Sequence, residues 1–324
     1  MSKTSRREAI LALEKKRQSK VIVYFLGDRQ PIQIFGTKVA NDVVPYFERI
    51  LAQQGKTDKI SLFLYGRGGD MDAPWPIVSI IREFCDEFEV IIPRRALSAA
   101  TLLSLGANRI IMTPFATISP IDPEGNFPQS DGKVLQIPTE DIFSFIEFSK
   151  SKIGLRSENS KAEILKALLK YEPKELGNIF RAYNYIRQLA KGMLSLHLDA
   201  VKNKKRIDDI VENLTEKAYK HNHLVGRKEA KYKVGLGEII EFAEDPDPAD
   251  LVLIENLFAA IEGDTLVNVP LNVEEALQQS AGQPAVIDCI RALVQADQLN
   301  VEGKSTVVIA PNGQVKAGFY WTEV

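Results

Sequence analysis

Cysteine and histidine are scarce in this chain: its 324 residues include two cysteines and three histidines. Cys85 and Cys289 lie far apart, in apolar runs whose spacing predicts helices, so they form neither a disulfide framework nor a zinc-binding pattern. His221 and His223 are the only close pair of histidines. We therefore expect no metal site, and a reducing, cytoplasmic compartment fits two unpaired thiols.

Long apolar runs and an excess of one charge are also absent. No run of about 18 apolar residues occurs, so the sequence predicts no transmembrane helix. Residues 1–20 are charged and helical and lack the apolar core of a signal peptide. The 41 basic and 43 acidic residues nearly cancel, which argues against a dedicated nucleic-acid-binding protein. The composition is typical of a folded globular chain with one large domain or two smaller ones.

The sequence lacks several common catalytic motifs. It has no Walker A motif and no H-E-x-x-H, and Ser98 does not stand in G-x-S-x-G. Gly66, Gly68 and Gly69 lack the spacing of a dinucleotide-binding loop. These absences exclude P-loop, zincin and α/β-hydrolase patterns, and we expect no cofactor.

Strands and helices alternate over the N-terminal part of the chain. Short, apolar, β-branched runs predict four strands, at 19–26, 59–65, 88–93 and 109–112. Apolar residues at helical intervals predict helices between them, at 36–54, 74–84 and 98–106. Pro45 within the first of these indicates either a kink or a helix that begins later. This β-α-β series predicts an α/β fold with a mostly parallel sheet.

The pattern changes from about residue 138. Apolar stripes predict a run of helices, over 140–153, 161–171, 173–203, 206–220 and 227–234. Residues 238–264 then hold nine acidic residues and no lysine or arginine, and we expect a solvated linker there. Asn312-Gly313 between two alternating runs predicts a C-terminal β-hairpin. We thus expect three regions: an N-terminal helix (1–18), a main domain (19–237), and an acidic linker with a small helix-plus-hairpin region (238–324).

Two turns contain residues suited to catalysis. Gly68 and Gly69 follow a strand and precede a helix, where glycine lets the backbone approach a ligand, although a tight turn alone explains them too. Ser98 begins the next helix. It is either a helix cap or a nucleophile beside free N–H groups and the positive end of the helix dipole. Ala99 and Ala100 leave room for a substrate.

Three runs together resemble the Clp-fold serine peptidases: LFLYGRGGD at 62–70, ALSAATLLSLGANRI at 96–110 and ISPIDP at 118–123. The resemblance is to the serine dehydrogenase proteinase family, which is related to signal peptide peptidase A. It covers residues 20–125 and extends weakly over 214–236. It implies a Clp/crotonase-like ββα spiral with a mostly parallel sheet, a helical insertion, a small C-terminal extension and assembly into a homo-oligomer.

The resemblance also implies roles for individual residues. It makes Ser98 the nucleophile, the backbone N–H groups of Gly69 and Ala99 the oxyanion hole, and Gly68 part of the substrate-binding segment. The implied activity is that of a serine endopeptidase, which cleaves a peptide or protein substrate through an acyl-enzyme and without ATP.

Several residues are candidates for the general base. Asp122 stands 24 residues after Ser98, where the Clp proteolytic subunit has its histidine, and it would orient a base or bind substrate. Lys150 and Lys152 lie at the distance of the catalytic lysine in signal peptide peptidase A. His221 is the third candidate, because histidine is the residue type best suited to act as a base near pH 7. Each is equally explained as a turn or surface residue.

Two other functions remain open on the same fold. An acyl-CoA enzyme would use the oxyanion hole without Ser98, although no basic cluster for the CoA phosphates lies near these motifs. A non-enzymatic oligomeric scaffold would fit the lack of a recognisable base.

Overall fold

The computed structural model describes residues 3–121, 124–128, 134–168, 173–215, 223–280 and 282–324. The chain forms two compact units. The first comprises Met1–Ile118 with Leu224–Val324, and the second is the intervening Ser119–His223.

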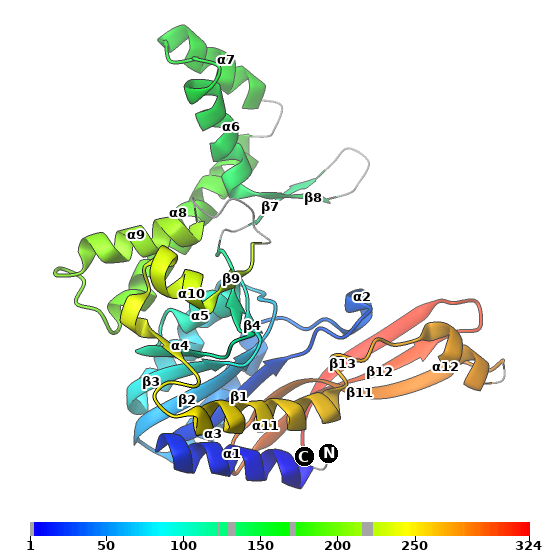
Figure 1. Cartoon of the computed structure of the whole chain (residues 1–324). Helices are drawn as coiled ribbons and strands as arrows, with labels where there is room; N and C mark the ends of the chain where they lie inside the picture. Colours follow the sequence, from blue (N-terminus) through cyan, green and yellow to red (C-terminus); the bar gives the residue numbers. More distant parts are fainter. Residues whose placement is uncertain (1–2, 122–123, 129–133, 169–172, 216–222, 281) are drawn as a thin grey trace. The chain divides into compact units, whose positions relative to one another are not determined.

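The first unit is built on an eight-stranded sheet with the order β10-β5-β3-β2-β1-β11-β12-β13 (Figure 1). Neighbours from β10 to β1 are parallel, and neighbours from β1 to β13 are antiparallel. The predicted α/β class with a parallel sheet is therefore confirmed. The strands are β1 (Lys20–Leu26), β2 (Thr57–Tyr65), β3 (Cys85–Ile92), β5 (Arg109–Met112), β10 (Ile240–Phe242), β11 (Ala285–Gln295), β12 (Asn300–Ile309) and β13 (Val315–Glu323).

Helices cover both faces of the parallel strands. On one face, α1 (Lys3–Arg17) and α11 (Pro248–Thr265) lie side by side (Figure 1) and share a core with Val23 of β1. Successive strand residues face opposite sides, so Tyr24 points to the other face, where its ring meets that of Phe47 at 5.5 Å. The helices α3 (Val44–Gln54), α4 (Pro74–Glu83) and α5 (Ala99–Ser104) follow the first three strands in turn.

Pro45 lies in the first turn of α3, because proline fits there and not in a helix interior. Of the two alternatives for the helix at 36–54, a kink or a later start, the structure thus has the later start. The positions of the cysteines differ from those expected. Cys85 and Cys289 lie on β3 and β11 instead of on helices. Both are partly buried free thiols.

The acidic segment after residue 237 is not a solvated linker. It contains β10, which pairs with β5 at the edge of the sheet, and then α11, which buries Ile254, Leu257, Phe258 and Ile261. Its carboxylates instead meet the basic end of α1, where Asp250 bonds Arg17. The high acidic content of the segment hides its apolar spacing. The predicted hairpin between β12 and β13 is confirmed, with Gly313 at φ +81° in the turn.

Buried ion pairs link both ends of α1 to the sheet. Arg6 is fully buried, and its guanidinium donates to Glu302 at 2.8 Å and to Gln295 at 3.0 Å. At the other end, Arg17 donates to both oxygens of Glu89, at 2.6 and 2.8 Å.

The second unit is the helical insertion. It contains the hairpin of β7 (Glu124–Pro128) and β8 (Val134–Pro138), followed by the helices α6 (Thr139–Ser151), α7 (Glu158–Leu168), α8 (Pro173–Ser195) and α9 (Lys204–Thr215). The helix predicted at 173–203 thus ends early. In the parts of the chain that the structure describes, no helix is both long and apolar enough to cross a membrane.

Candidate active site

The turn after β2 and the start of α5 are joined backbone to backbone. The Gly66 N–H donates to Arg95 O at 3.0 Å, and the Leu97 N–H donates back to Gly66 O at 3.1 Å. This pair of bonds forms a parallel bridge between Gly66 and Ala96. The two sequence motifs, which lie apart in the chain, are therefore neighbours in the fold.

Gly68 lies directly against Ser98. Its φ is +102°, and a Cβ added at this position would stand 2.6 Å from the Cβ of Ser98 and 3.2 Å from the Ala99 nitrogen. A real Cβ does not approach another carbon so closely, and L-residues rarely adopt this φ. Only glycine lets the turn after β2 pack onto the serine, and Gly68 is buried there.

Gly69 presents its N–H to solvent. The Val39 N–H donates to Gly68 O and the Asp70 N–H donates to Val39 O, both at 2.8 Å. Because the polar groups of successive extended residues point to opposite sides, the N–H and C=O of Gly69 point away from Val39. Among the described residues, no acceptor lies within hydrogen-bond distance of this N–H. Gly69 itself is exposed.

Ser98 has a strained backbone. Its φ is +51° and its ψ is −117°, a region that residues other than glycine rarely occupy and that is frequent at functional sites. Its side chain makes no capping hydrogen bond to α5, so the interpretation as a helix cap is not supported. The Oγ atom lies 3.6 Å from the Met71 sulfur and is partly exposed.

Ala99 is the first residue of α5, and α5 is buried along its whole length. Its N–H has no acceptor within the described part of the chain. The Gly69 and Ala99 N–H groups are therefore two donors on either side of the Gly68–Ser98 contact. Such a pair is able to hold an oxyanion.

The buried carboxylate of Asp28 contacts an arginine from each of the two turns. It accepts a hydrogen bond from Tyr65 Oη at 2.7 Å and lies 3.1 Å from Arg95 and 3.9 Å from Arg67. Arg67 directly precedes Gly68, and Arg95 begins the segment that leads to Ser98. Burial and the nearby Asp28 carboxylate raise the pKa of Tyr65, so its hydroxyl stays a donor. Asp28 was not predicted from the sequence, because its partners Arg67 and Arg95 lie far from it in the chain.

The predicted bases belong to the second unit. Asp122 and His221 lie outside the described residues. Lys150 is exposed on α6, and Lys152 is exposed just beyond it. All three histidines fall between Ser119 and His223, so the first unit contains no histidine.

The insertion begins at a strand next to the one that leads to Ser98, and it ends at a further strand of the same small sheet. A three-stranded sheet has the order β4 (Arg95–Ala96), β6 (Thr117–Ile118) and β9 (Val225–Gly226). β6 is parallel to β4 and antiparallel to β9. The chain therefore enters the insertion from the end of β6 that lies beside the Ser98 end of β4, and it returns into β9 at that same end.

No described group of three or more His, Cys, Asp and Glu side chains has the arrangement of a metal site. In the described parts of the site, the available chemistry is thus a hydroxyl, two backbone donors and the charged groups around Asp28.

Comparison with known sequences agrees with these motifs. Residues 1–141 match the family of ClpP-like SDH-type serine proteinases, so the resemblance is confirmed for that part of the chain. An uncharacterized protein of Methanocaldococcus jannaschii is 30% identical over 129 residues, which are 38% of this chain and 45% of that protein. The chain thus matches less than half the length of this relative.

Solved structures of similar proteins include a mutant of the 1510-N membrane-bound stomatin-specific protease, at 25% identity and a TM-score of 0.28, covering 35% of this chain and 57% of that one. A ClpP1 mutant from Listeria monocytogenes is 14% identical with a TM-score of 0.40, covering 74% and 99% of the two chains. The ClpP catalytic domain from Plasmodium falciparum is 13% identical with a TM-score of 0.37, covering 75% and 94%.

Proposed function

We propose, on the premise that residues 1–141 match the ClpP-like SDH-type serine proteinases, that this chain is a serine endopeptidase with Ser98 as its nucleophile. The contact between Gly68 and Ser98 is the observation that carries the proposal. It brings a strained serine next to two backbone N–H groups, those of Gly69 and Ala99, that have no acceptor among the described residues. A helix cap or a simple tight turn would need neither feature.

In the proposed reaction, Ser98 Oγ attacks the carbonyl carbon of the scissile peptide bond, and its proton passes to a general base. The carbonyl oxygen becomes an oxyanion and accepts hydrogen bonds from the N–H groups of Gly69 and Ala99. The C–N bond then breaks as the base returns the proton to the leaving amine. The acyl group stays on Ser98 until water hydrolyses the ester.

For the base we propose His221, with Asp122 to orient it. Asp122 follows β6 by four residues and His221 precedes β9 by four, and these strands lie in one small sheet with β4, which leads to Ser98. Lys150 is the alternative. The absence of histidine from the first unit supports a base supplied by the insertion.

We further propose that an extended peptide binds along the Gly68-Gly69 segment by strand addition. The exposed Gly69 C=O, which points away from Val39, supports this because it is open to a peptide N–H. ATP independence, a cytoplasmic location and a homo-oligomeric state complete the proposal. The free thiols of Cys85 and Cys289 fit the location.

Labelling with a fluorophosphonate probe tests the nucleophile. We expect the wild-type chain to label and Ser98→Ala to fall to background. Ser79→Ala, a change of a partly buried serine on α4, serves as the matched control and should label as wild type does. Labelling that persists in Ser98→Ala would refute the assignment.

If the folded wild-type chain does not label, the alternatives can be separated. Thermal stabilisation by an acyl-CoA would favour an acyl-CoA enzyme on the same fold, and its absence would favour an oligomeric scaffold.

A further inference from the structure

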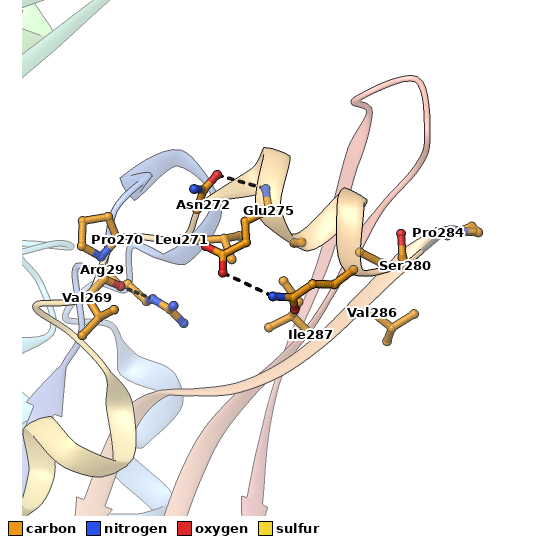
Figure 2. A pocket seen from close by; sticks show the side chains of 13 residues that line it. Arg29, Val269, Pro270, Leu271, Asn272, Glu275, Ser280, Pro284, Val286 and Ile287 are labelled. Carbon is orange, nitrogen blue, oxygen red and sulfur yellow. Dashed lines mark hydrogen bonds between the residues drawn. The ribbon is translucent and has the colours of Figure 1, made fainter. Parts of the chain in front are cut away.

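A second candidate binding site lies between α12 (Val273–Gln279) and the first residues of β11. It is a pocket of about 530 Å³, a size typical of ligand sites. Figure 2 shows Arg29, Val269 and Pro270 at one end and Pro284 and Val286 at the other. None of these residues takes part in the proposed peptide cleavage.

One wall of the pocket includes an unpaired strand edge. β12 pairs with β11 over its full length, but β1 pairs only with Ala292–Gln295. At the next residue of β11, the Gly27 N–H donates to Arg291 O at 2.7 Å. Within the described chain, no strand pairs with Ala285–Ile290 on the side that β1 occupies further along. Such an edge presents a row of N–H and C=O groups to an incoming strand.

The segment that follows β1 closes one end of the pocket. It runs from β11 towards the loop before α12, where the Leu271 N–H donates to Gln30 O at 2.9 Å. In the same place, Arg29 Nε donates to Val269 O at 2.7 Å. A peptide added to the edge of β11 cannot continue past this segment. One of its termini must therefore lie beside Arg29.

Arg29 gives this closed end a positive charge. Its guanidinium packs over the Phe35 ring at 5.1 Å, and burial lowers its pKa. Among the described residues, its only hydrogen-bond acceptor is Val269 O. A guanidinium with unused N–H groups pairs best with a carboxylate, and of the two ends of a peptide only the C-terminus carries one.

We propose that this pocket binds the C-terminal segment of an extended peptide, with the terminal carboxylate on Arg29 and the backbone added to the free edge of β11. Arg29 lies beside Cys289 and Ile290, so the bound peptide runs in the same direction as β11. Val269 and Val286, exposed by 51% and 62%, give its side chains apolar contacts. Glu275, which accepts a hydrogen bond from Gln279 at 3.3 Å, also lines the pocket and disfavours acidic side chains in the bound peptide.

Binding is measured on the full chain carrying Ser98→Ala, so that cleavage does not interfere and the result does not depend on the proposed activity. The probe is a pool of fluorescein-labelled heptapeptides with apolar C-terminal residues, prepared as free acids and as amides. We expect amidation to weaken binding at least tenfold. Arg29→Gln should remove the difference between acid and amide.

A second variant covers the case in which Arg29→Gln fails to fold. Val269→Glu places a carboxylate beside Arg29 at an exposed position and should also abolish the preference for free acids. Val252→Glu, at an exposed position on α11, is the matched control and should retain it.

Three results would overturn the proposal. The first is equal binding of the free acids and the amides. The second is no binding of any peptide below about 1 mM. The third is a preference for free acids that survives Val269→Glu.

Discussion

Gly68 and Ser98 are in contact so close that no Cβ fits at position 68, where it would stand 2.6 Å from the Cβ of the serine. The contact joins the turn after β2 to the start of α5 and sets the position of the proposed nucleophile relative to the backbone N–H groups of Gly69 and Ala99. It therefore links the packing of the fold to the geometry of the site, and it is open to direct test.

Gly68→Ala should slow probe labelling strongly. The added methyl group forces Ser98 or Leu97 to move and sits at a φ of +102°, so we expect at least a hundredfold slower labelling and a loss of about 1–3 kcal/mol in the free energy of unfolding. Gly318→Ala, where a Cβ meets nothing within 4 Å, is the control for a glycine change alone. Full labelling in Gly68→Ala would show that this contact does not position the serine.

The sequence predicted the parallel half of the sheet well, because strands such as β1 and β2 are buried on both faces and are rich in β-branched and apolar residues. It also predicted the Asn312-Gly313 turn, whose chemistry is local. β11 was missed. Its apolar residues do not alternate cleanly, because the first residues of this strand pack next to α12 and its last four residues pair with β1.

The site was predictable only where its motifs are local. The glycine pair and Ser98 stood out in the sequence, but the sequence showed neither the positive φ of Ser98 nor its contact with Gly68. Asp28 was not predictable, because its partners Arg67 and Arg95 are brought to it by the pairing of distant strands. The acidic segment at α11 was misjudged because its carboxylates pair with α1, a contact that no local pattern reveals.

Asp28→Asn should loosen both turns at once. The asparagine can still accept from Tyr65 Oη, but Arg95 and Arg67 lose their common counter-charge. Both arginines are partly exposed, so we expect a stability loss of only about 1–2 kcal/mol, together with slower probe labelling. Tyr65→Phe removes the hydroxyl and leaves the charges in place. If Asp28→Asn has a lower free energy of unfolding but labels at the wild-type rate, Asp28 supports the fold and not the site.

The pairing of Glu89 with Arg17 should make stability depend on pH. Burial acts to raise the pKa of Glu89, but hydrogen bonds from Arg17 and Ser61 outweigh it and hold the pKa below the ordinary value of 4.5. A carboxyl group whose pKa is lowered by folding stabilises the fold above its unfolded pKa, and this contribution is lost as the pH falls through the folded pKa. We expect Glu89→Gln to be less stable than wild type at pH 7, with a difference that shrinks below about pH 4.5. Urea unfolding of both chains from pH 7 to pH 3 measures this difference, and a constant difference across the range would contradict the linkage.

The pair of Arg6 and Glu302 should show the asymmetry of a buried ion pair. Both side chains are fully buried, so Arg6→Met removes one of the two counter-charges of Glu302, the other being Lys304 at 3.3 Å, and we expect a loss of up to about 3–5 kcal/mol. The double variant Arg6→Met with Glu302→Met removes both buried charges. It should be more stable than Arg6→Met alone, because the other partners, Asp264 and Lys304, reach solvent. Chemical unfolding of the three chains measures this. A double variant that is less stable than the single one would mean that packing, and not the unpaired charge, dominates.

The proposed base is best tested with the two neighbouring histidines, because they differ in role but not in chemistry. His221→Gln should lower the labelling rate by about a hundredfold or more, since without a base the Ser98 hydroxyl keeps its proton. His223→Gln, two residues further along, is the matched control and should label as wild type does. Should Lys150→Met abolish labelling while His221→Gln retains it, the base would be the lysine.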